Sequence, residues 1–221
     1  MIQDLENYQI NPYQVIFMKD SFFNRVYNFI YRHKFAFGTY IYTRCQYMKC
    51  YFQSVKIGKA CKFKGPSNFL VGNGGHIEIG EKCIFTSYET LNRIGLNHRC
   101  IITASPVSDQ ETCLLKIGND CGFSATSIWC FKEIIIGNNV RCGANTLIMD
   151  GDAHFEDPRT SPPKTIVIED NVFLGANVVV KKGVTIGKNS VIGMNSVVTR
   201  DIPENCIAVG NPCKVIKRIT L

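Results

Sequence analysis

His154 is the residue in this chain best suited to proton transfer. It lies in the stretch GDAHFEDPRTSPPKT (151–165), and Asp150 and Asp152 stand four and two positions before it. An unperturbed imidazole titrates near neutral pH, so it can take a proton from a reacting group and later return it. Either aspartate could orient the ring or contact a bound molecule, and both could equally be solvated loop carboxylates. By position alone, His154 is either a general base or a polar loop residue without a catalytic role.

The eleven cysteines do not have the pattern of a metal site or of a disulfide scaffold. No C-x-x-C pair occurs, no cysteine and histidine cluster has zinc-finger spacing, and an odd number cannot pair completely. Cys61, Cys83 and Cys121 occupy positions that valine fills in other repeats, so we interpret them as small core residues. We therefore expect no metal and a reducing, cytoplasmic compartment.

The composition limits the class of protein further. A net charge of +7 and a pI near 8.8 suit phosphorylated cofactors, nucleic acid or an anionic membrane surface, and charge alone does not choose among them. The first ten residues, MIQDLENYQI, are polar and acidic, which predicts no signal peptide. No run approaches the ~18 apolar residues of a membrane-spanning helix.

The elements that must position His154 follow a period of six residues. From Ile168 to Pro203 the chain reads IEDNVF, LGANVV, VKKGVT, IGKNSV, IGMNSV and VTRDIP. The first place is always aliphatic and the fifth is small or aliphatic, while glycine or asparagine permits the unusual backbone angle of a bend. Neither a helix nor a single strand has this period. The pattern predicts a parallel β-helix in which each six is a short strand and a bend.

A signature such as IEIGEKC recurs six times and sets the length of one coil. Its isoleucines are separated by 22, 38, 19, 32 and 18 residues: Ile57, Ile79, Ile117, Ile136, Ile168 and Ile186. The last separation equals three hexads, which predicts a prism with three flat faces and six to seven coils. The longest separation predicts an additional coil plus a loop at 105–112. The separation of 32 predicts a protruding loop at 151–165, where prolines and polar residues cannot continue the strands.

Residues 1–54 lie outside the repeats and are predicted to form a helical extension. Asn11-Pro12 is typical of a helix start, and residues 35–52 are aromatic and basic, which suits a second helix or an irregular cover. Two interpretations remain open: a cap over the end of the shaft, or an element that rests on a membrane surface. We expect the repeats over 55–205 and a last partial coil with a basic tail over 206–221.

Residues 55–221 closely resemble the hexapeptide-repeat acyltransferases. The resemblance is strongest over 134–218, from IIIGNNVRCGANT through the His154 loop to VGNPCKVIKRI. The nearest branch comprises sugar O-acetyltransferases of the maltose and galactoside type and those that act on capsule or exopolysaccharide. The resemblance implies an all-β fold, a left-handed parallel β-helix, against the usual handedness of crossovers. It also implies homotrimers with the active site between neighbouring prisms, and acetyl-CoA as co-substrate.

The resemblance further implies roles for individual residues. His154 stands where the family has its catalytic base, and Ser124 is expected near the acceptor pocket. The cations near the end of the chain suit a polyanionic cofactor. The residues expected along the acetyl-CoA groove are Ala176, Met194, Thr199, Arg200, Lys214 and Lys217. Met194 is larger than the residue usual at its position. Lys181 and Lys182 are either phosphate contacts or a solvated pair.

We therefore expect an acetyl-CoA-dependent O-acetyltransferase that acts on a sugar or saccharide hydroxyl in polysaccharide biosynthesis, by direct attack. N-acetylation of an amino sugar or sugar nucleotide is the alternative, and a non-catalytic scaffold agrees less well with His154. A β-helix carbonic anhydrase would need about three histidine ligands for zinc, and the spacing of His76, His98 and His154 does not match. Expected partners are a saccharide or lipid-linked sugar and two further copies of the chain, but no nucleic acid. A peripheral contact of residues 1–50 with the inner face of a membrane stays open.

Overall fold

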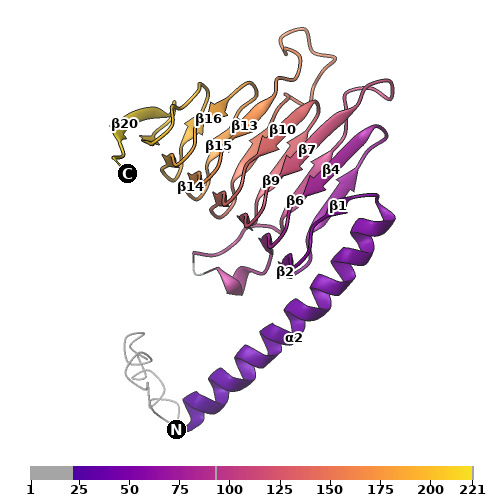
Figure 1. The fold of residues 1–221 in the computed structure, drawn as a ribbon, viewed down its shortest axis with the longest axis vertical. Coiled ribbons are helices and arrows are strands. Elements are labelled where there is room, and N and C mark those ends of the chain that lie inside the picture. Colours follow the sequence, from indigo (N-terminus) through magenta and orange to yellow (C-terminus); the bar gives the residue numbers. More distant parts are fainter. Residues whose placement is uncertain (1–21, 93, 221) are drawn as a thin grey trace, which may run out of the picture. The chain divides into compact units, whose positions relative to one another are not determined.

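The structure, a computed structural model, describes residues 22–92 and 94–220 (Figure 1). The helix start expected at Asn11-Pro12 lies outside the described residues. The described helices are α2 (Phe22–Phe52) and the short 3-10 helix η1 (Glu89–Leu91).

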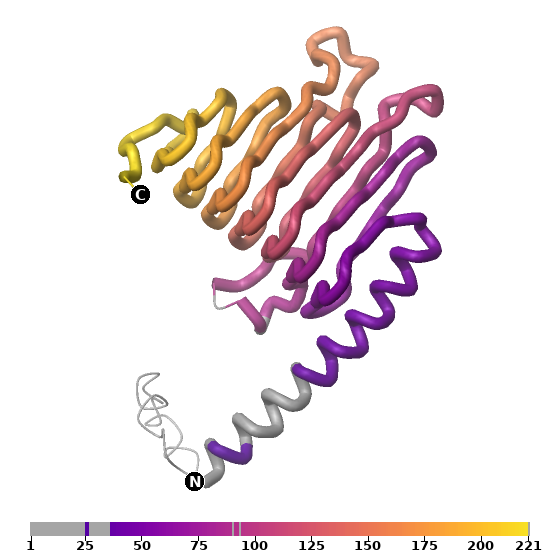
Figure 2. Tube along the Cα trace, in the orientation of Figure 1, coloured from indigo at the N-terminus to yellow at the C-terminus, as the bar shows by residue number. Residues whose placement is uncertain are grey.

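The hexads fold into three parallel β-sheets that form the three faces of a prism (Figure 2). Sheet A contains β1 (Lys56–Ile57), β4 (Gly75–Ile79), β7 (Cys113–Ile117), β10 (Glu133–Ile136), β13 (Ile166–Ile168) and β16 (Thr185–Ile186). Sheet B contains β2 (Lys62–Lys64), β5 (Ile84–Thr86), β8 (Gly122–Ser124), β11 (Arg141–Cys142), β14 (Phe173–Leu174), β17 (Val191–Ile192), β19 (Cys206–Val209) and β20 (Lys214–Arg218). Sheet C contains β3 (Asn68–Val71), β6 (Ile101–Ala104), β9 (Ser127–Cys130), β12 (Leu147–Met149), β15 (Val179–Val180) and β18 (Val197–Val198).

The chain visits sheets A, B and C in turn, and each coil stacks directly on the preceding one. Sheets A and C contain six strands each, in agreement with the expected number of coils. Ile57 pairs with Ile79, and Ile79 pairs with Ile117. The prediction of an additional coil between Ile79 and Ile117 is therefore wrong. The extra residues form two loops of a single coil, one between β5 and β6 and one between β6 and β7.

The interior of the prism is filled by the positions that the hexad pattern assigns to it. The first-place aliphatic residues are completely buried: Ile168, Leu174, Val180, Ile186, Ile192 and Val198. The three cysteines at fifth places are also buried, and their thiols donate to the carbonyl of the next coil. The sulfur–oxygen distances are 3.2 Å from Cys61 to Gly80, 3.2 Å from Cys83 to Gly118 and 3.1 Å from Cys121 to Gly137. All eleven cysteines are free thiols.

Asparagine accounts for the bends between faces. Asn171, Asn177, Asn189 and Asn195 have φ between 57° and 60°, a left-handed conformation that asparagine tolerates better than most residues. Their amides also bond from coil to coil, with 3.0 Å from Asn171 Nδ2 to Asn189 Oδ1 and 3.0 Å from Asn177 Nδ2 to Asn195 Oδ1. The hexad therefore encodes both the buried strand and the bend that follows it.

Residues 35–52 are not a second helix or an irregular cover, because α2 runs unbroken from Phe22 to Phe52. The chain divides within this helix into two compact units, Met1–Gly38 and Thr39–Leu221. The part of α2 from Thr39 onwards packs on the first coil: Tyr47 Oη donates to the Gly58 carbonyl at 2.7 Å, and Thr43 Oγ1 accepts from the Phe63 amide at 3.0 Å. In the described part of the chain, no helix combines the length and apolar character needed to cross a bilayer.

A column of phenylalanines in the first coils predicts where the fold is most sensitive. The Phe85 ring is fully buried and stacks between Phe63 and Phe123, with centroids 4.9 and 5.1 Å away. Phe85→Ala is expected to lower the free energy of unfolding by about 3–5 kcal/mol, because it leaves a cavity that the rigid coils cannot close. Urea denaturation followed by circular dichroism measures the change. The matched control is Phe173→Ala at a half-exposed ring, with an expected loss below about 1 kcal/mol. Equal losses in the two variants would contradict the column as a stability determinant.

Candidate functional site

The loop that carries His154 leaves the prism between β12 in sheet C and β13 in sheet A (Figure 1). We call this edge the C–A corner; it also contains residues 131–132, 181–184 and 199–201 of neighbouring coils. The loop is held by its own hydrogen bonds. The His154 carbonyl accepts from the Asp157 amide at 3.1 Å and from Thr160 Oγ1 at 3.0 Å, and Asp157 forms an ion pair with Arg159. The loop therefore has a defined conformation that fixes the backbone of His154.

The His154 side chain projects into solvent, with 77% of its surface exposed. Its Nδ1 atom lies 3.6 Å from Glu156 Oε1, and the Glu156 side chain is equally exposed. This distance is too long for a hydrogen bond. Glu156 was not among the residues expected from the sequence, where only the aspartates that precede His154 were considered. Its i, i+2 spacing from His154 was the available signal.

Asp150 fixes the base of the loop from inside the prism. Its carboxylate is fully buried and accepts from three consecutive backbone amides, those of Phe131 at 2.7 Å, Lys132 at 2.9 Å and Glu133 at 2.8 Å. Burial raises the pKa of the Asp150 carboxyl, while the three N–H donors act in the opposite direction. Asp150 thus links the loop to the preceding coil, and its action on the imidazole of His154 stays a prediction.

Asp152 and Lys182 connect the loop to the following coil. The Lys182 ammonium forms an ion pair with the Asp152 carboxylate and donates to the Ser161 carbonyl at 2.6 Å. The lysine side chain is only 13% exposed, and its hydrogen bond lowers the pKa of the Asp152 carboxyl. Lys182 therefore binds the loop near its beginning, at Asp152, and near its end, at Ser161. These contacts account for a positive charge at this position without a bound phosphate. Its neighbour Lys181 is exposed.

Three aromatic rings lie beside the base of the loop. Trp129, the single tryptophan of the chain, lies 4.6 Å from Phe131, and Phe131 lies 4.9 Å from Phe155, measured between ring centroids. Phe155 directly follows His154, whereas Trp129 is 39% exposed on the outer surface of sheet C. This group was not expected from the sequence, because its members lie on two coils. It offers an apolar surface next to the candidate base.

The residues expected to contact the cofactor lie at three places. Ala176 and Met194 are at the corner between sheets B and C, which we call the B–C corner, and Ser124, the residue expected near the acceptor, lies at the same corner. Ala176 packs against a small cluster formed by Leu96, Ala125 and Ala144, and Met194 is 68% exposed.

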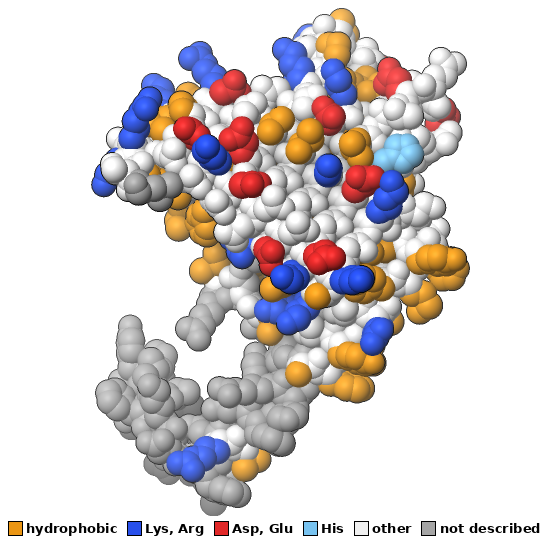
Figure 3. Space-filling model, viewed as in Figure 1, with side chains coloured by type: hydrophobic (Ala, Val, Ile, Leu, Met, Phe, Trp, Pro, Cys, Tyr) orange, Lys and Arg blue, Asp and Glu red, His pale blue; other side chains and the backbone are white. Residues whose placement is uncertain are grey.

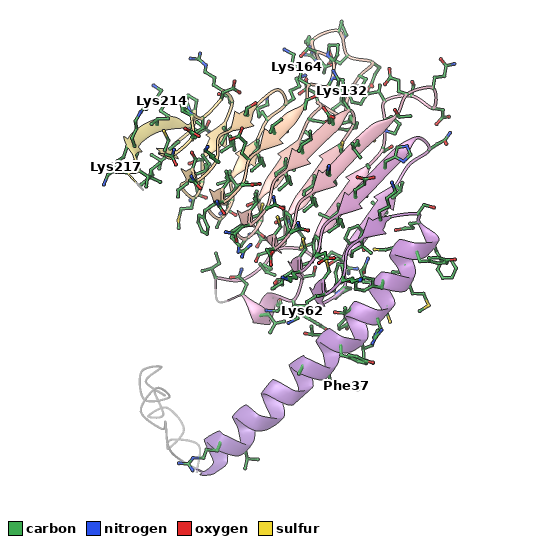
Figure 4. The ribbon with its side chains drawn as sticks, in the orientation of Figure 1. Phe37, Lys62, Lys132, Lys164, Lys214 and Lys217 are labelled. Atoms are coloured by element: carbon green, nitrogen blue, oxygen red, sulfur yellow. The ribbon has the colours of Figure 1, made fainter. Side chains whose placement is uncertain are left out.

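The remaining cofactor candidates are exposed and mostly basic. Thr199 and Arg200 lie at the C–A corner, after β18. Lys214 and Lys217 lie on β20, which pairs antiparallel with β19 at the end of sheet B (Figure 4). The tail after residue 206 is thus a hairpin strand whose side chains from Lys214 to Arg218 are all exposed.

Within one chain, the two corners lie at opposite edges of sheet C. Lys181 follows Ala176 by five residues, which corresponds to at most roughly 17 Å at ~3.3 Å per residue. His154 therefore does not lie beside Ala176 and Met194 of its own prism. In the part of the chain that the structure describes, no three His, Cys, Asp or Glu side chains come together as a metal would require.

Comparison with known proteins agrees with this architecture. The sequence profile described as hexapeptide repeat of succinyl-transferase matches residues 165–200. These residues of the chain are similar to the hexapeptide-repeat family. It is 47% identical over 92 residues to the galactoside O-acetyltransferase of Lactococcus lactis subsp. lactis (strain IL1403), covering 39% of this chain and 44% of that protein. It is 40% identical over 81 residues to the 2,3,4,5-tetrahydropyridine-2,6-dicarboxylate N-acetyltransferase of Staphylococcus aureus (strain Newman), covering 37% of this chain and 31% of that protein.

The chain thus spans less than half the length of these two relatives. Among solved structures, it resembles the polySia specific acetyltransferase NeuO, with a TM-score of 0.55 and 22% identity over 76% of this chain and 77% of that chain. A mutant of AntD, an N-acyltransferase from Bacillus cereus, gives a TM-score of 0.51 and 15% identity over 75% and 84% of the two chains. At such identities the comparison concerns the fold alone. The expected left-handed parallel β-helix is confirmed.

The Lys182 contacts predict how the loop responds to substitution. Lys182→Met is expected to lower the protection factors of the amides in residues 152–161 at least tenfold at pH 7, because both limbs lose their common partner. Hydrogen exchange read by mass spectrometry measures this change, and Lys181→Met at the exposed neighbour is the matched control.

The pH dependence of the same difference follows from Asp152. Its folded pKa is lowered, so the ion pair stabilises the loop above the ordinary aspartate value of ~3.9 and is lost as the pH falls through the lowered folded value. The difference between wild type and Lys182→Met should therefore shrink in strong acid, where the Lys182 hydrogen bond to the Ser161 carbonyl remains but the ion pair does not. An undiminished difference at pH 2 would mean that the packing of the Lys182 side chain, rather than its charge, holds the loop.

Proposed function

We propose that this hexapeptide-repeat protein is an acetyltransferase that transfers the acetyl group of acetyl-CoA to a hydroxyl group of a sugar or saccharide. The observation that carries the proposal is His154, held on an ordered loop at a corner of the β-helix and free to meet a substrate. Two relatives that are 40% or more identical over the repeats are named as acetyltransferases, which supports the reaction class. The free thiols support a reducing, cytoplasmic location.

Acetyl-CoA supplies the acetyl group as a thioester. The neutral imidazole of His154 accepts the proton of the acceptor hydroxyl while the oxygen attacks the carbonyl carbon. The new C–O ester bond forms, the C–S bond breaks, and its electron pair leaves with the sulfur. The imidazolium then returns its proton to the thiolate, so that free CoA and neutral His154 are regenerated.

The exposed cations fit a polyanionic ligand. Arg200, Lys214 and Lys217 extend from the last coils, where they are free to bind the phosphates of acetyl-CoA through charge-assisted hydrogen bonds. Ala176 and Met194 would line the groove for its amide-rich arm, with Thr199 at the other corner. Ser124, on the same corner as Ala176, would face the acceptor.

The proposed site requires a second prism. His154 is at the C–A corner, whereas Ala176, Met194 and Ser124 are at the B–C corner, on the other side of sheet C and roughly 17 Å away. A neighbouring copy that placed its B–C corner against the C–A corner of this chain would bring the two sets together and would shield His154 from water. This arrangement supports the homotrimer as part of the proposal, with three equivalent sites between copies.

The acceptor surface favours a carbohydrate. The exposed ring of Trp129, which packs on the buried ring of Phe131, provides an apolar surface near the loop against which the C–H face of a sugar can pack. The alternative acceptor is the amine of an amino sugar, since His154 can deprotonate either group, and one relative is named as an N-acetyltransferase.

The deciding experiment measures thiol release from acetyl-CoA with matched sugars and amino sugars, followed by mass spectrometry of the product. Absence of CoA binding and of thiol release with every acceptor would exclude the proposed enzyme.

Substitution of His154 tests its role as base. His154→Asn should lower kcat by ~10²-fold or more while the melting temperature stays unchanged, because the exposed ring contributes little to packing. His76→Asn, at an exposed histidine on β4, is the matched control and should retain wild-type turnover. Turnover of His154→Asn within threefold of wild type would remove His154 from the reaction.

The two lysines of β20 are expected to act through binding of the cofactor. Lys214→Gln combined with Lys217→Gln should raise the KM for acetyl-CoA about tenfold, equivalent to ~1.4 kcal/mol, with little change in kcat. The effect should shrink at high salt, where charges are screened. Lys62→Gln on the first coil is the control, since Lys62 lies at the opposite end of the prism from β20 (Figure 4). A fall in kcat at constant KM would place these lysines outside the cofactor site.

A further inference from the structure

The part of α2 from Thr39 to Phe52 is apolar on an inner face and on an outer face that adjoins it. Its inner face packs on the first coil through Thr43, Tyr47 and Cys50, and the Cys50 side chain is fully buried. This packing explains why the residues of the inner face are apolar. It does not explain the apolar residues of the outer face.

The outer face of α2 exposes large apolar side chains to solvent. The exposed fractions are 56% for Tyr40, 42% for Ile41, 58% for Met48, 81% for Tyr51 and 77% for Phe52. At ~100° per residue, these residues and Arg44 fall within an arc of about 120°. Figure 3 shows apolar side chains gathered along this segment of the surface. A contiguous stripe of this kind is unusual on a surface that faces only water.

The charge of α2 points to an anionic partner. Between Phe22 and Phe52 the sequence contains no aspartate or glutamate, and its five basic residues are Arg25, Arg32, Lys34, Arg44 and Lys49. Arg44 lies within the stripe, with its guanidinium 5.3 Å from the centre of the Tyr40 ring. Lys49 is exposed at the flank of the stripe.

We propose that the outer face of α2, formed by Tyr40, Ile41, Arg44, Met48, Tyr51 and Phe52, docks on the surface of an anionic lipid bilayer. The helix lies in the interface: the phenyl ring of Phe52 and the side chains of Met48 and Ile41 enter the boundary of the acyl chains. Tyrosines place their rings at the same depth and their hydroxyls among the headgroups. Arg44 and Lys49 bind lipid phosphates.

A second copy of the chain fits the same face less well. Two such helices in contact would bring Arg44 and Lys49 together with the cations of the other copy, and α2 contains no carboxylate to neutralise them. Anionic headgroups satisfy both the apolar and the basic side chains at once. The inference is independent of the proposed enzyme activity, because membrane binding is measured without substrate.

Co-sedimentation of the full chain with vesicles tests the inference. Wild type should bind vesicles of phosphatidylglycerol and phosphatidylcholine at 0.15 M salt, and bind pure phosphatidylcholine at least tenfold more weakly. The variant Tyr51→Ser with Phe52→Ser should lose at least tenfold in partition coefficient, with an unchanged circular dichroism spectrum because the inner face is untouched. Arg44→Gln with Lys49→Gln should reduce binding to the anionic vesicles and abolish most of its salt dependence.

A matched control removes exposed apolar side chains elsewhere. Leu70→Ser with Ile94→Ser changes side chains that are 50% and 69% exposed on sheet C and on the loop after β5, and it should bind vesicles like wild type. Three results would overturn the inference: wild type that stays in solution at every lipid concentration, a Tyr51→Ser/Phe52→Ser variant that binds within twofold of wild type, or an equal loss in the control. A smaller particle mass for the Tyr51→Ser/Phe52→Ser variant in light scattering without lipid would assign the face to self-association instead.

Discussion

The backbone pairing between successive coils is the constraint on which every other feature of this protein depends. Ile57, Ile79 and Ile117 lie one above another although 22 and 38 residues separate them along the chain. Because each strand must satisfy the N–H and C=O groups of the next, added residues cannot change the register and are expelled at the corners. The loop of His154 is such an insertion. Stacking thus fixes where chemistry can be added, and it leaves the identity of the inserted residues free.

An insertion becomes a precise site only when it is tied to the coils on both sides. Asp150 connects the first residue of the loop to three amides of the coil before it, and Lys182 on the coil after it binds Asp152 and Ser161. The aromatic contact between Phe131 and Phe155 adds a third tie. These groups fix the backbone of the loop and do not contact the imidazole itself. They keep His154 in one place although its own side chain is almost free of contacts that would hold it, and a base must be positioned to be effective.

The repeats could be predicted from the sequence because each hexad contains both the aliphatic residue that is buried and the residue that forms the bend. Ile168 is buried, and Asn171 has the left-handed backbone conformation of the bend. Local patterns could not predict how insertions are divided: 38 residues between Ile79 and Ile117 fit an extra coil as well as two loops. The roles of Asp150 and Lys182 depend on which coils meet, and no spacing along the chain reveals that. The continuity of α2 was not predicted from the sequence. Its inner and outer faces are both apolar, and this obscures the helical period that a single apolar face would give.

The solid interior of the prism also determines how acceptors can be chosen. The inward positions are filled by completely buried side chains, so a substrate can bind only on the outer faces and at the corners. A flat parallel sheet offers few distinguishing groups, so in the proposed enzyme the inserted loops and a neighbouring copy would select the acceptor. For the same reason, the segments outside the repeats are where the identity of the acceptor must be sought: the loop of His154, the aromatic group beside it and the helix α2.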